Sequence, residues 1–184
     1  MRRAATAVLR LSDLISTFRT EPGGWGEPRI PTCSDYPGDR SNTTITGKAV
    51  SSFTDGFDVM GSKALFFKSK LDAVNYWKKT AGSAFAACNA WAITQNVKPG
   101  ATATPVEARA LPAPATGADA TAAYRTVTRF DVPDHPSYDW YETTVFVRAG
   151  RALGMVHVAY ANQVCECYAG MARVLTQRLR AASR

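Results

Sequence analysis

The chain has 184 residues, of which 46% are hydrophobic and 20% are charged. This length fits one domain with a real core, and the composition excludes wholesale disorder. No apolar run approaches the about 20 residues that a membrane-spanning helix needs. The charge of +7 lies largely near the termini, without a basic stripe interleaved with aromatics. We therefore expect a solvated basic surface rather than a nucleic-acid partner.

The first 42 residues predict a helix followed by a long loop. Apolar residues recur at helical spacing over residues 4–17. The stretch 20–42 is dense in Gly, Pro, Asp and Ser, so it must be irregular. A loop of this length is unusual unless it is stapled or functional, and Trp25 and Cys33 are its natural anchors. We expect one domain of residues 1–184, in which 1–42 form this helix and stapled loop and 43–184 form the body.

The first half of the body predicts a hairpin and a long helix. Strand-like runs at 43–53 and 59–68 flank a turn at Asp55-Gly56. Ser69 with Asp72 resembles a capping box that starts a helix. Apolar residues then recur at intervals of three and four as far as Ala92, which predicts one buried helix face with a bend at Gly82. The predicted buried face is Leu71, Val74, Trp77, Ala81, Ala84, Phe85, Cys88, Trp91 and Ala92.

The second half predicts a meander and a closing helix. An edge strand is expected at 106–111 and a small-residue linker at 115–122. Strands at 124–132, 138–147 and 151–160 have short connections, which favours antiparallel neighbours. A helix follows at about 168–182. The predicted fold class is α+β, an antiparallel sheet meander with helices packed on one face and disulfide staples.

The turn at Arg148-Ala149-Gly150 decides which side chains share a face of the last hairpin. A three-residue loop ending in Gly150 pairs Val147 with Arg151 and Tyr141 with His157. A tight two-residue turn would need Ala149 at positive φ and would set Glu142 against His157. We prefer the first register, which separates Tyr141 and His157 from Glu142.

Both faces of these strands are substantially apolar, so one face should meet helices and the other should line a groove. The polar and aromatic candidates for ligand binding there are Glu142, His157, Arg125, Arg129 and Trp140. Each of them also has an ordinary structural explanation, such as a hydrogen-bonded core histidine or an exposed arginine. The stretch containing Asp131, Asp134, His135 and Asp139 is typical of turns, so we expect no metal there.

Four cysteines, Cys33, Cys88, Cys165 and Cys167, favour disulfides over zinc, because their spacing lacks two matched pairs of ligands. Disulfides in turn favour an extracytoplasmic protein, secreted or held in the cell envelope. Met1-Arg2-Arg3 resembles the start of a signal peptide, but Arg10 and Asp13 interrupt the apolar region that should follow. We expect the signal or anchor to lie outside this chain.

Enzyme motifs are missing from the sequence. It contains no G-x-S-x-G elbow, H-E-x-x-H pair, P-loop or dinucleotide-binding glycine pattern, and we expect no cofactor. A non-catalytic binding domain for an unknown small molecule or cell-envelope component is the favoured function. The alternatives are a small cell-envelope hydrolase that uses carboxylates such as Glu142 or Asp139, and a module that docks another protein.

The order of these features resembles a known family. An LSDL-like segment, the loop residues Trp25 and Cys33, FFKSKLDAVNYW before the helix with Cys88, the hairpin FVRAGRALGMVHVAY and the final YAGMARVLTQRLRAA are its matching parts. They resemble the actinobacterial extracytoplasmic sensor domains typified by the external domain of the mycobacterial kinase PknH and by related lipoproteins.

The resemblance implies a non-enzymatic antiparallel sheet with helices, two disulfides and a ligand cleft. It also implies a Cys33–Cys88 bridge and a second bridge that includes Cys165. The sequence departs from the family there, because Cys167 follows Cys165 after one residue and the predicted central helix has one cysteine. The second pair is therefore either a local Cys165–Cys167 bridge or missing. Any signalling output is expected outside this chain.

Overall fold

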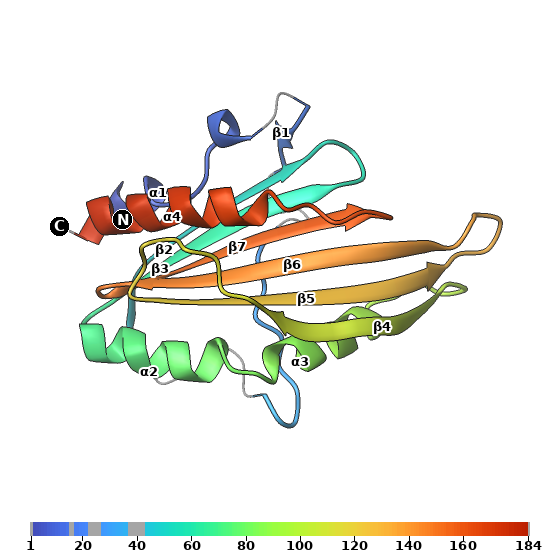
Figure 1. The fold of residues 1–184 in the computed structure, drawn as a ribbon, viewed down its shortest axis with the longest axis horizontal. Helices are drawn as coiled ribbons and strands as arrows, with labels where there is room; N and C mark the ends of the chain where they lie inside the picture. The colour runs from blue at the N-terminus through green and yellow to red at the C-terminus, as the bar shows by residue number, and fades with distance from the viewer. Residues whose placement is uncertain (1, 15–16, 22–26, 37–42, 184) are drawn as a thin grey trace.

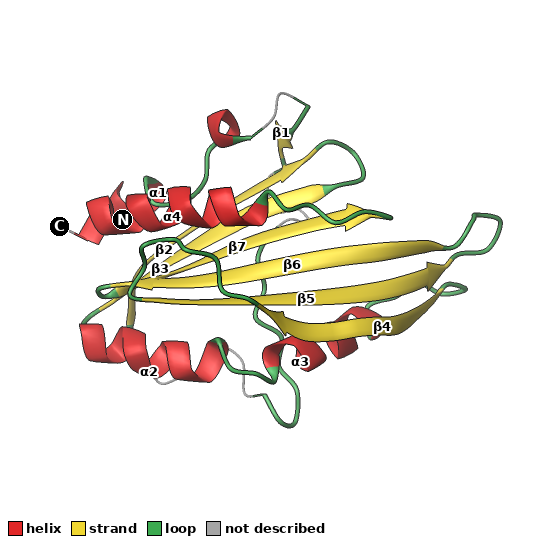
Figure 2. Cartoon of the chain, viewed as in Figure 1, coloured by secondary structure: helices red, strands yellow, loops and turns green. Residues whose placement is uncertain are grey.

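Seven antiparallel strands form one sheet in the computed structural model of the protein (Figures 1 and 2). The structure describes residues 2–14, 17–21, 27–36 and 43–183. The strand order is β1-β2-β3-β7-β6-β5-β4. The strands are β1 (Arg19–Thr20), β2 (Ile45–Thr54), β3 (Val59–Phe67), β4 (Thr102–Leu111), β5 (Ala120–Asp131), β6 (Tyr138–Ala149) and β7 (Ala152–Ala161). The helices are α1 (Arg2–Ala5), the 3-10 helix η1 (Leu11–Asp13), α2 (Lys70–Thr80), α3 (Phe85–Thr94) and α4 (Tyr168–Ser183).

Most predicted elements of the body are confirmed. The β2–β3 hairpin, the edge strand β4, the β5–β6–β7 meander and helix α4 lie where the sequence indicates them. The strands alternate side chains between two faces, and β7 defines these faces. Gly154, Val156 and Val158 point to α4, whereas Leu153 and Met155 point to α2 and α3. We call these the α4 face and the α2–α3 face.

The helices cover both faces of the sheet. The predicted fold class, an α+β antiparallel sheet stapled by a disulfide, is confirmed, but the helices do not share one face as expected. Met171, Leu175 and Leu179 of α4 belong to one buried cluster, and Tyr76 and Phe85 belong to the other. Because the central strands are apolar on both sides, each side requires its own cover.

The predicted central helix is two helices. The Ser69–Asp72 capping box starts α2 as expected, and the chain leaves helical geometry between Thr80 and Phe85. The predicted buried face is wrong for α2, where Ala73, Tyr76 and Thr80 are buried and Leu71 is 67% exposed. Helix α2 is rotated by about one residue from the predicted orientation, so that Tyr76 faces the core. The centroid of its ring lies 5.0 Å from that of Phe67.

The register of the last hairpin also differs from the expectation. Ala149 pairs with Ala152, so the turn consists of Gly150 and Arg151. Gly150, with a φ of 59°, is the first residue of this turn rather than the last of a three-residue loop. Val147 consequently pairs with Gly154 instead of Arg151. A shift by three residues exchanges the faces, so Glu142 and His157 share a face and Tyr141 lies on the other.

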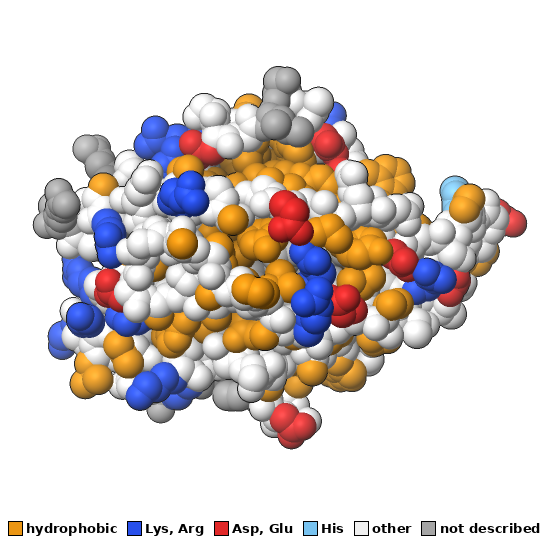
Figure 3. All heavy atoms as spheres, in the orientation of Figure 1, with side chains coloured by type: hydrophobic (Ala, Val, Ile, Leu, Met, Phe, Trp, Pro, Cys, Tyr) orange, Lys and Arg blue, Asp and Glu red, His pale blue; other side chains and the backbone are white. Residues whose placement is uncertain are grey.

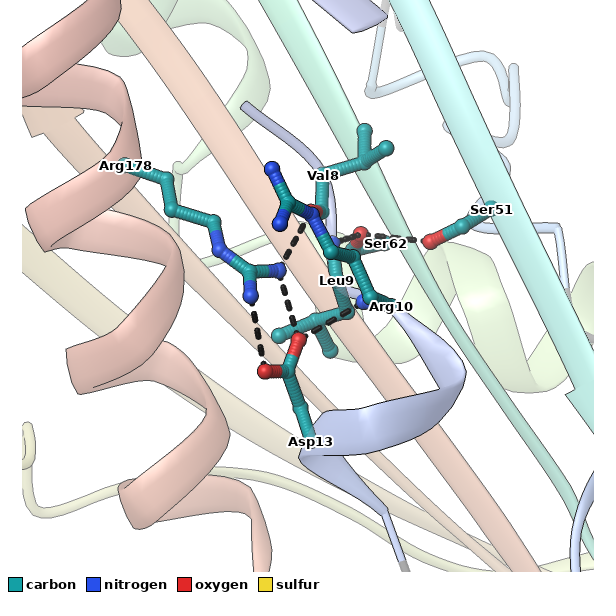
Figure 4. Close-up of polar contacts among 7 residues, drawn as sticks. All are labelled: Val8, Leu9, Arg10, Asp13, Ser51, Ser62 and Arg178. Carbon is teal, nitrogen blue, oxygen red and sulfur yellow. Dashed lines mark hydrogen bonds and ion pairs between the residues drawn. The ribbon is translucent and has the colours of Figure 1, made fainter. Parts of the chain in front are cut away.

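The N-terminal segment lies across the α4 face and is not one helix. Only α1 and η1 are helical within residues 2–14, because the backbone between them bonds to the rest of the fold (Figure 4). The Leu9 amide donates to Ser62 Oγ at 2.7 Å, and Arg178 donates to the Val8 carbonyl at 2.7 Å. A continuous helix would have used these backbone groups internally. Leu9 is buried as a result.

The Cys33–Cys88 bridge staples the long loop to α3, as expected. Tyr36 packs beside it against Phe85, with ring centroids 6.0 Å apart, and its hydroxyl donates to the Thr80 carbonyl. Cys165 and Cys167 form the second, local bridge just before α4. Trp25, the other expected anchor of the loop, lies outside the described residues.

Candidate functional site

The predicted ligand-binding residues lie on opposite faces of the sheet. Trp140, Glu142 and His157 point to the α2–α3 face, because Glu142 contacts α3 and His157 follows Met155 by two residues. Arg125 and Arg129 follow Ala123 at even intervals and lie on the α4 face. No site on one face therefore includes all five side chains.

Glu142 holds α3 against the sheet. Its Oε2 accepts a hydrogen bond from Asn89 Nδ2 at 2.7 Å, and its Oε1 accepts one from Trp140 Nε1 at 3.0 Å. The same Asn89 nitrogen lies 3.3 Å from the hydroxyl of Thr126. Both carboxylate oxygens of the half-buried Glu142 thus have protein partners. These hydrogen bonds give Trp140 and Glu142 a structural role, which is to hold α3 against the sheet.

His157 lies beside Thr144 of the neighbouring strand. The distance between its Nδ1 and Thr144 Oγ1 is 3.3 Å. A histidine next to a hydroxyl is one element of nucleophilic catalysis. Thr144 is buried in the sheet, however, which keeps its hydroxyl away from any substrate. The pair therefore stabilises the β6–β7 contact.

Arg129 forms an ion pair with Asp139. Its Nε and Nη2 donate to the two carboxylate oxygens of Asp139, at 2.6 and 3.0 Å. This bidentate hydrogen bonding lowers the pKa of Asp139. The Asp139 amide in turn donates to Asn162 Oδ1 at 2.9 Å. The pair engages Nε and Nη2 of Arg129 and both carboxylate oxygens of Asp139, so an anionic ligand at Arg129 would compete with Asp139.

Arg125 is different, because its side chain is mostly buried and incompletely paired. Its side chain is 11% exposed, and Nη2 lies 3.4 Å from Oε1 of Glu166. Its Nε is buried without a hydrogen-bond partner. A guanidinium has five N–H donors in a rigid fork. Arg125 therefore keeps donor capacity on the α4 face.

Arg109 of β4 lies directly opposite Arg125 in the β4–β5 ladder. Its Nε donates to Glu107 Oε1 at 2.7 Å. We call Arg109, Arg125, Glu107, Glu166 and Tyr168 the arginine cluster. Figure 3 shows basic side chains in a column over the β4–β5 region, with one acidic group above it, another at its side, and hydrophobic surface on both sides.

Tyr168, the first residue of α4, completes the cluster. Burial raises the pKa of its hydroxyl, as do the charge of Glu166 and a hydrogen bond to it, whereas Arg125 and Arg109 lower the pKa. The Tyr168 hydroxyl therefore lies within electrostatic reach of Glu166, Arg125 and Arg109. Tyr168 is half-buried.

The cluster lies where none of the described helices covers the α4 face. Helix α4 packs on β6 and β7, and α3 packs on β4 and β5 from the other side (Figure 1). On the α4 side of β4 and β5 near Arg109 and Arg125, the described helices make no comparable packing, and Figure 3 shows basic side chains at the surface over these strands. This uncovered area is the candidate site.

Sequence reasoning identified Arg125 and missed Arg109. The alternation of Glu107, Arg109 and Leu111 in an expected strand places these three residues on one face. The missing information was the pairing of β4 with β5, which a connection of eight residues (112–119) separates. No local pattern sets Arg109 opposite Arg125.

Within the described residues, no group of three or more His, Cys, Asp or Glu side chains is arranged to hold a metal ion. In the acidic turn, Ser137 donates to Asp131 and Asp139 binds Arg129. The described part of the chain also contains no helix that is long and apolar enough to span a membrane.

Comparison with known proteins adds no relative. No protein-family model matches the chain, and no curated protein matches it. The functional argument therefore rests on the geometry described above.

Proposed function

We propose that this protein is a non-catalytic, extracytoplasmic ligand-binding domain of the sensor-like kind, and that its ligand lies on the uncovered part of the α4 face. The observation that carries the proposal is Arg125, whose side chain is 11% exposed and incompletely paired, on a sheet surface that none of the described helices covers. Ligand sites typically combine apolar surface with a few polar groups that fix orientation. The resemblance to the PknH-like sensor domains supports the same function.

The partners that Glu142 and Asp139 already have favour ligand binding over hydrolysis as the function. A carboxylate hydrolase needs one acid and one base that both reach the substrate. Glu142 is bound by Asn89 and Trp140, and Asp139 is bound by Arg129. Activation of water by either group would require it to give up these partners.

The two bridges support the proposed location. Disulfides persist in oxidising compartments and are rare in a reducing cytosol. Thiol alkylation of native protein under non-reducing conditions, followed by mass spectrometry, tests this point. We expect no alkylated cysteine, whereas four alkylated thiols would overturn the extracytoplasmic location.

Ligand binding is tested by backbone NMR with a panel of small molecules that includes neutral, anionic and cationic compounds. We expect at least one compound to shift the amide signals of Arg109, Arg125 and Tyr141 while those around Asn89 stay in place. Compounds that bind only elsewhere, or that shift no signal of the α4 face, would contradict the proposed site.

A further inference from the structure

We propose that Arg109, Arg125 and Tyr168 bind the anionic group, a carboxylate or a phosphate, of a small ligand whose remaining part is apolar. The inference rests on the proposed function and names the ligand class for the same surface.

The hydrogen-bonding state of Arg125 is the first argument. Its Nε is buried without a partner, and the contact of Nη2 with Glu166 is 3.4 Å long. Leaving a buried charged donor unsatisfied is costly. Carboxylates and phosphates accept two parallel hydrogen bonds from a guanidinium. The buried Nε is out of reach of solvent, so an oxyanion would contact the Nη groups, whose one ion-pair contact is the long one to Glu166.

The position of Arg109 is the second argument. It is the direct cross-strand partner of Arg125, and like charges in that position repel. Glu107 accepts a hydrogen bond from Nε of Arg109 and so offsets part of its positive charge. An anion between the two guanidinium groups would remove the repulsion and contact both.

The end of α4 is the third argument. Helix α4 has 16 residues and no acidic residue in its first turn. Its N-terminus carries partial positive charge, which stabilises a nearby anion. Tyr168 begins this helix and lies close enough to Arg109 and Arg125 for both to lower its pKa. Three positive features thus meet at one place.

The acidic members of the cluster do not block such a ligand. Glu166 is 74% exposed, and an exposed ion pair of this length contributes little. A ligand anion can therefore replace Glu166 at Arg125 while the carboxylate moves into water. Glu166 would then act as a weak competitor for the site.

The surface around the cluster determines the rest of the ligand. Tyr141, Tyr168 and Leu111 are half-buried beside the arginines, and Figure 3 shows hydrophobic surface on both sides of the basic column. Such surface favours burial of an apolar group. The expected ligand is therefore an amphiphile with one anionic head.

The test measures binding of octyl phosphate, inorganic phosphate and octan-1-ol by calorimetry, with NMR mapping of the site. We expect octyl phosphate to bind most tightly and its affinity to fall with added salt. Arg125→Gln and Arg109→Gln should each weaken binding by about tenfold or more. Glu166→Gln should strengthen it.

Arg129→Gln is the matched control, because Arg129 lies on the same strand and face but is held by Asp139. It should leave octyl phosphate binding within about twofold of the unmodified protein. Thermal unfolding of each variant shows that it is folded, and the exposed Arg109 provides a second test if Arg125→Gln unfolds.

Two results would overturn the inference and leave the proposed function standing. One is equal binding of octan-1-ol and octyl phosphate on the α4 face. The other is octyl phosphate binding that neither Arg125→Gln nor Arg109→Gln weakens. Equal affinity for inorganic and octyl phosphate would overturn the apolar part of the proposed ligand.

Discussion

Arg178 and Asp13 form a bidentate ion pair across 165 residues of sequence. Nη1 and Nη2 of Arg178 lie 2.5 and 2.7 Å from the two carboxylate oxygens (Figure 4). The carboxylate also accepts a hydrogen bond from the Arg10 amide at 2.7 Å. The pair fixes the N-terminal segment to α4 and thereby holds Leu9 in the core of the α4 face.

Asp13→Asn should lower the free energy of unfolding by about 1–3 kcal/mol, because Arg178 then keeps only the Val8 carbonyl as a strong acceptor. The two side chains are only 19% and 13% exposed, so water replaces the lost partner poorly. Urea denaturation measures the change. Glu107→Gln is the control, since its ion pair is exposed and should contribute less than about 1 kcal/mol. Equal losses in both variants would contradict this account.

The Cys33–Cys88 bridge should contribute more to the free energy of unfolding than the local Cys165–Cys167 bridge. It joins residues 55 apart, and closing a loop of that length restricts the unfolded chain. We expect the double variant Cys33→Ala/Cys88→Ala to lose about 2–4 kcal/mol. The double variant Cys165→Ala/Cys167→Ala, whose loop has a separation of 2, should lose less. Urea denaturation of both, without reductant, compares them, and the reverse order would refute the argument.

The elements that could be predicted from the sequence are those with local causes. The Ser69–Asp72 box, the Asp55-Gly56 turn and the short connections between β5, β6 and β7 each involve neighbouring residues. Such signals set the fold class, whereas the Cys33–Cys88 bridge, which joins residues 55 apart, was expected from the resemblance. They do not report which face of the sheet a helix covers, and this explains why α4 and α2 were expected together.

The candidate site depended on contacts that sequence patterns do not encode. The register of β6 and β7 followed from whether Gly150 begins or ends its turn, and both positions accept glycine. Arg109 and Arg125 meet only because β4 pairs with β5 across a long connection. Glu142 looked available for a ligand until Asn89 of a distant helix was placed beside it.

Gly154 sets the distance between β7 and α4. A Cβ at this position would lie 2.7 Å from Leu175 Cδ2 and 2.8 Å from Leu179 Cδ1, and both leucines are fully buried. Gly154→Ala should therefore destabilise the protein by about 1–3 kcal/mol through overpacking. Thermal unfolding measures the loss.

Gly170→Ala in α4 is the control for Gly154→Ala, because no atom lies within 4 Å of its added Cβ. Alanine also favours the helix by up to about 1 kcal/mol. We expect this variant to be as stable as the unmodified protein or more so. A Gly154→Ala variant with unchanged stability would show that α4 is free to move away from the sheet.

Tyr160 should make the fold sensitive to high pH. Burial, aided by the negative charges of Asp58 and Asp55, raises its pKa from 10.0 to about 12. Its hydroxyl lies 3.9 Å from Met60 Sδ and 4.0 Å from Cys167 Sγ, neither of which stabilises a phenolate. Between these two pKa values the folded protein binds more protons than the unfolded chain. The contribution of the neutral Tyr160 to the free energy of unfolding is therefore fully present below pH 10 and is lost as the pH rises toward 12.

Tyr160→Phe removes this titration and keeps the packing of the ring. Urea denaturation at a series of pH values between 8 and 12 should show a shallower loss of stability in the variant than in the unmodified protein. Tyr124 and Tyr168, whose pKa values burial also raises, remain in both proteins and contribute to the residual slope. Identical pH profiles for the two proteins would mean that the Tyr160 phenolate reaches water in the folded state.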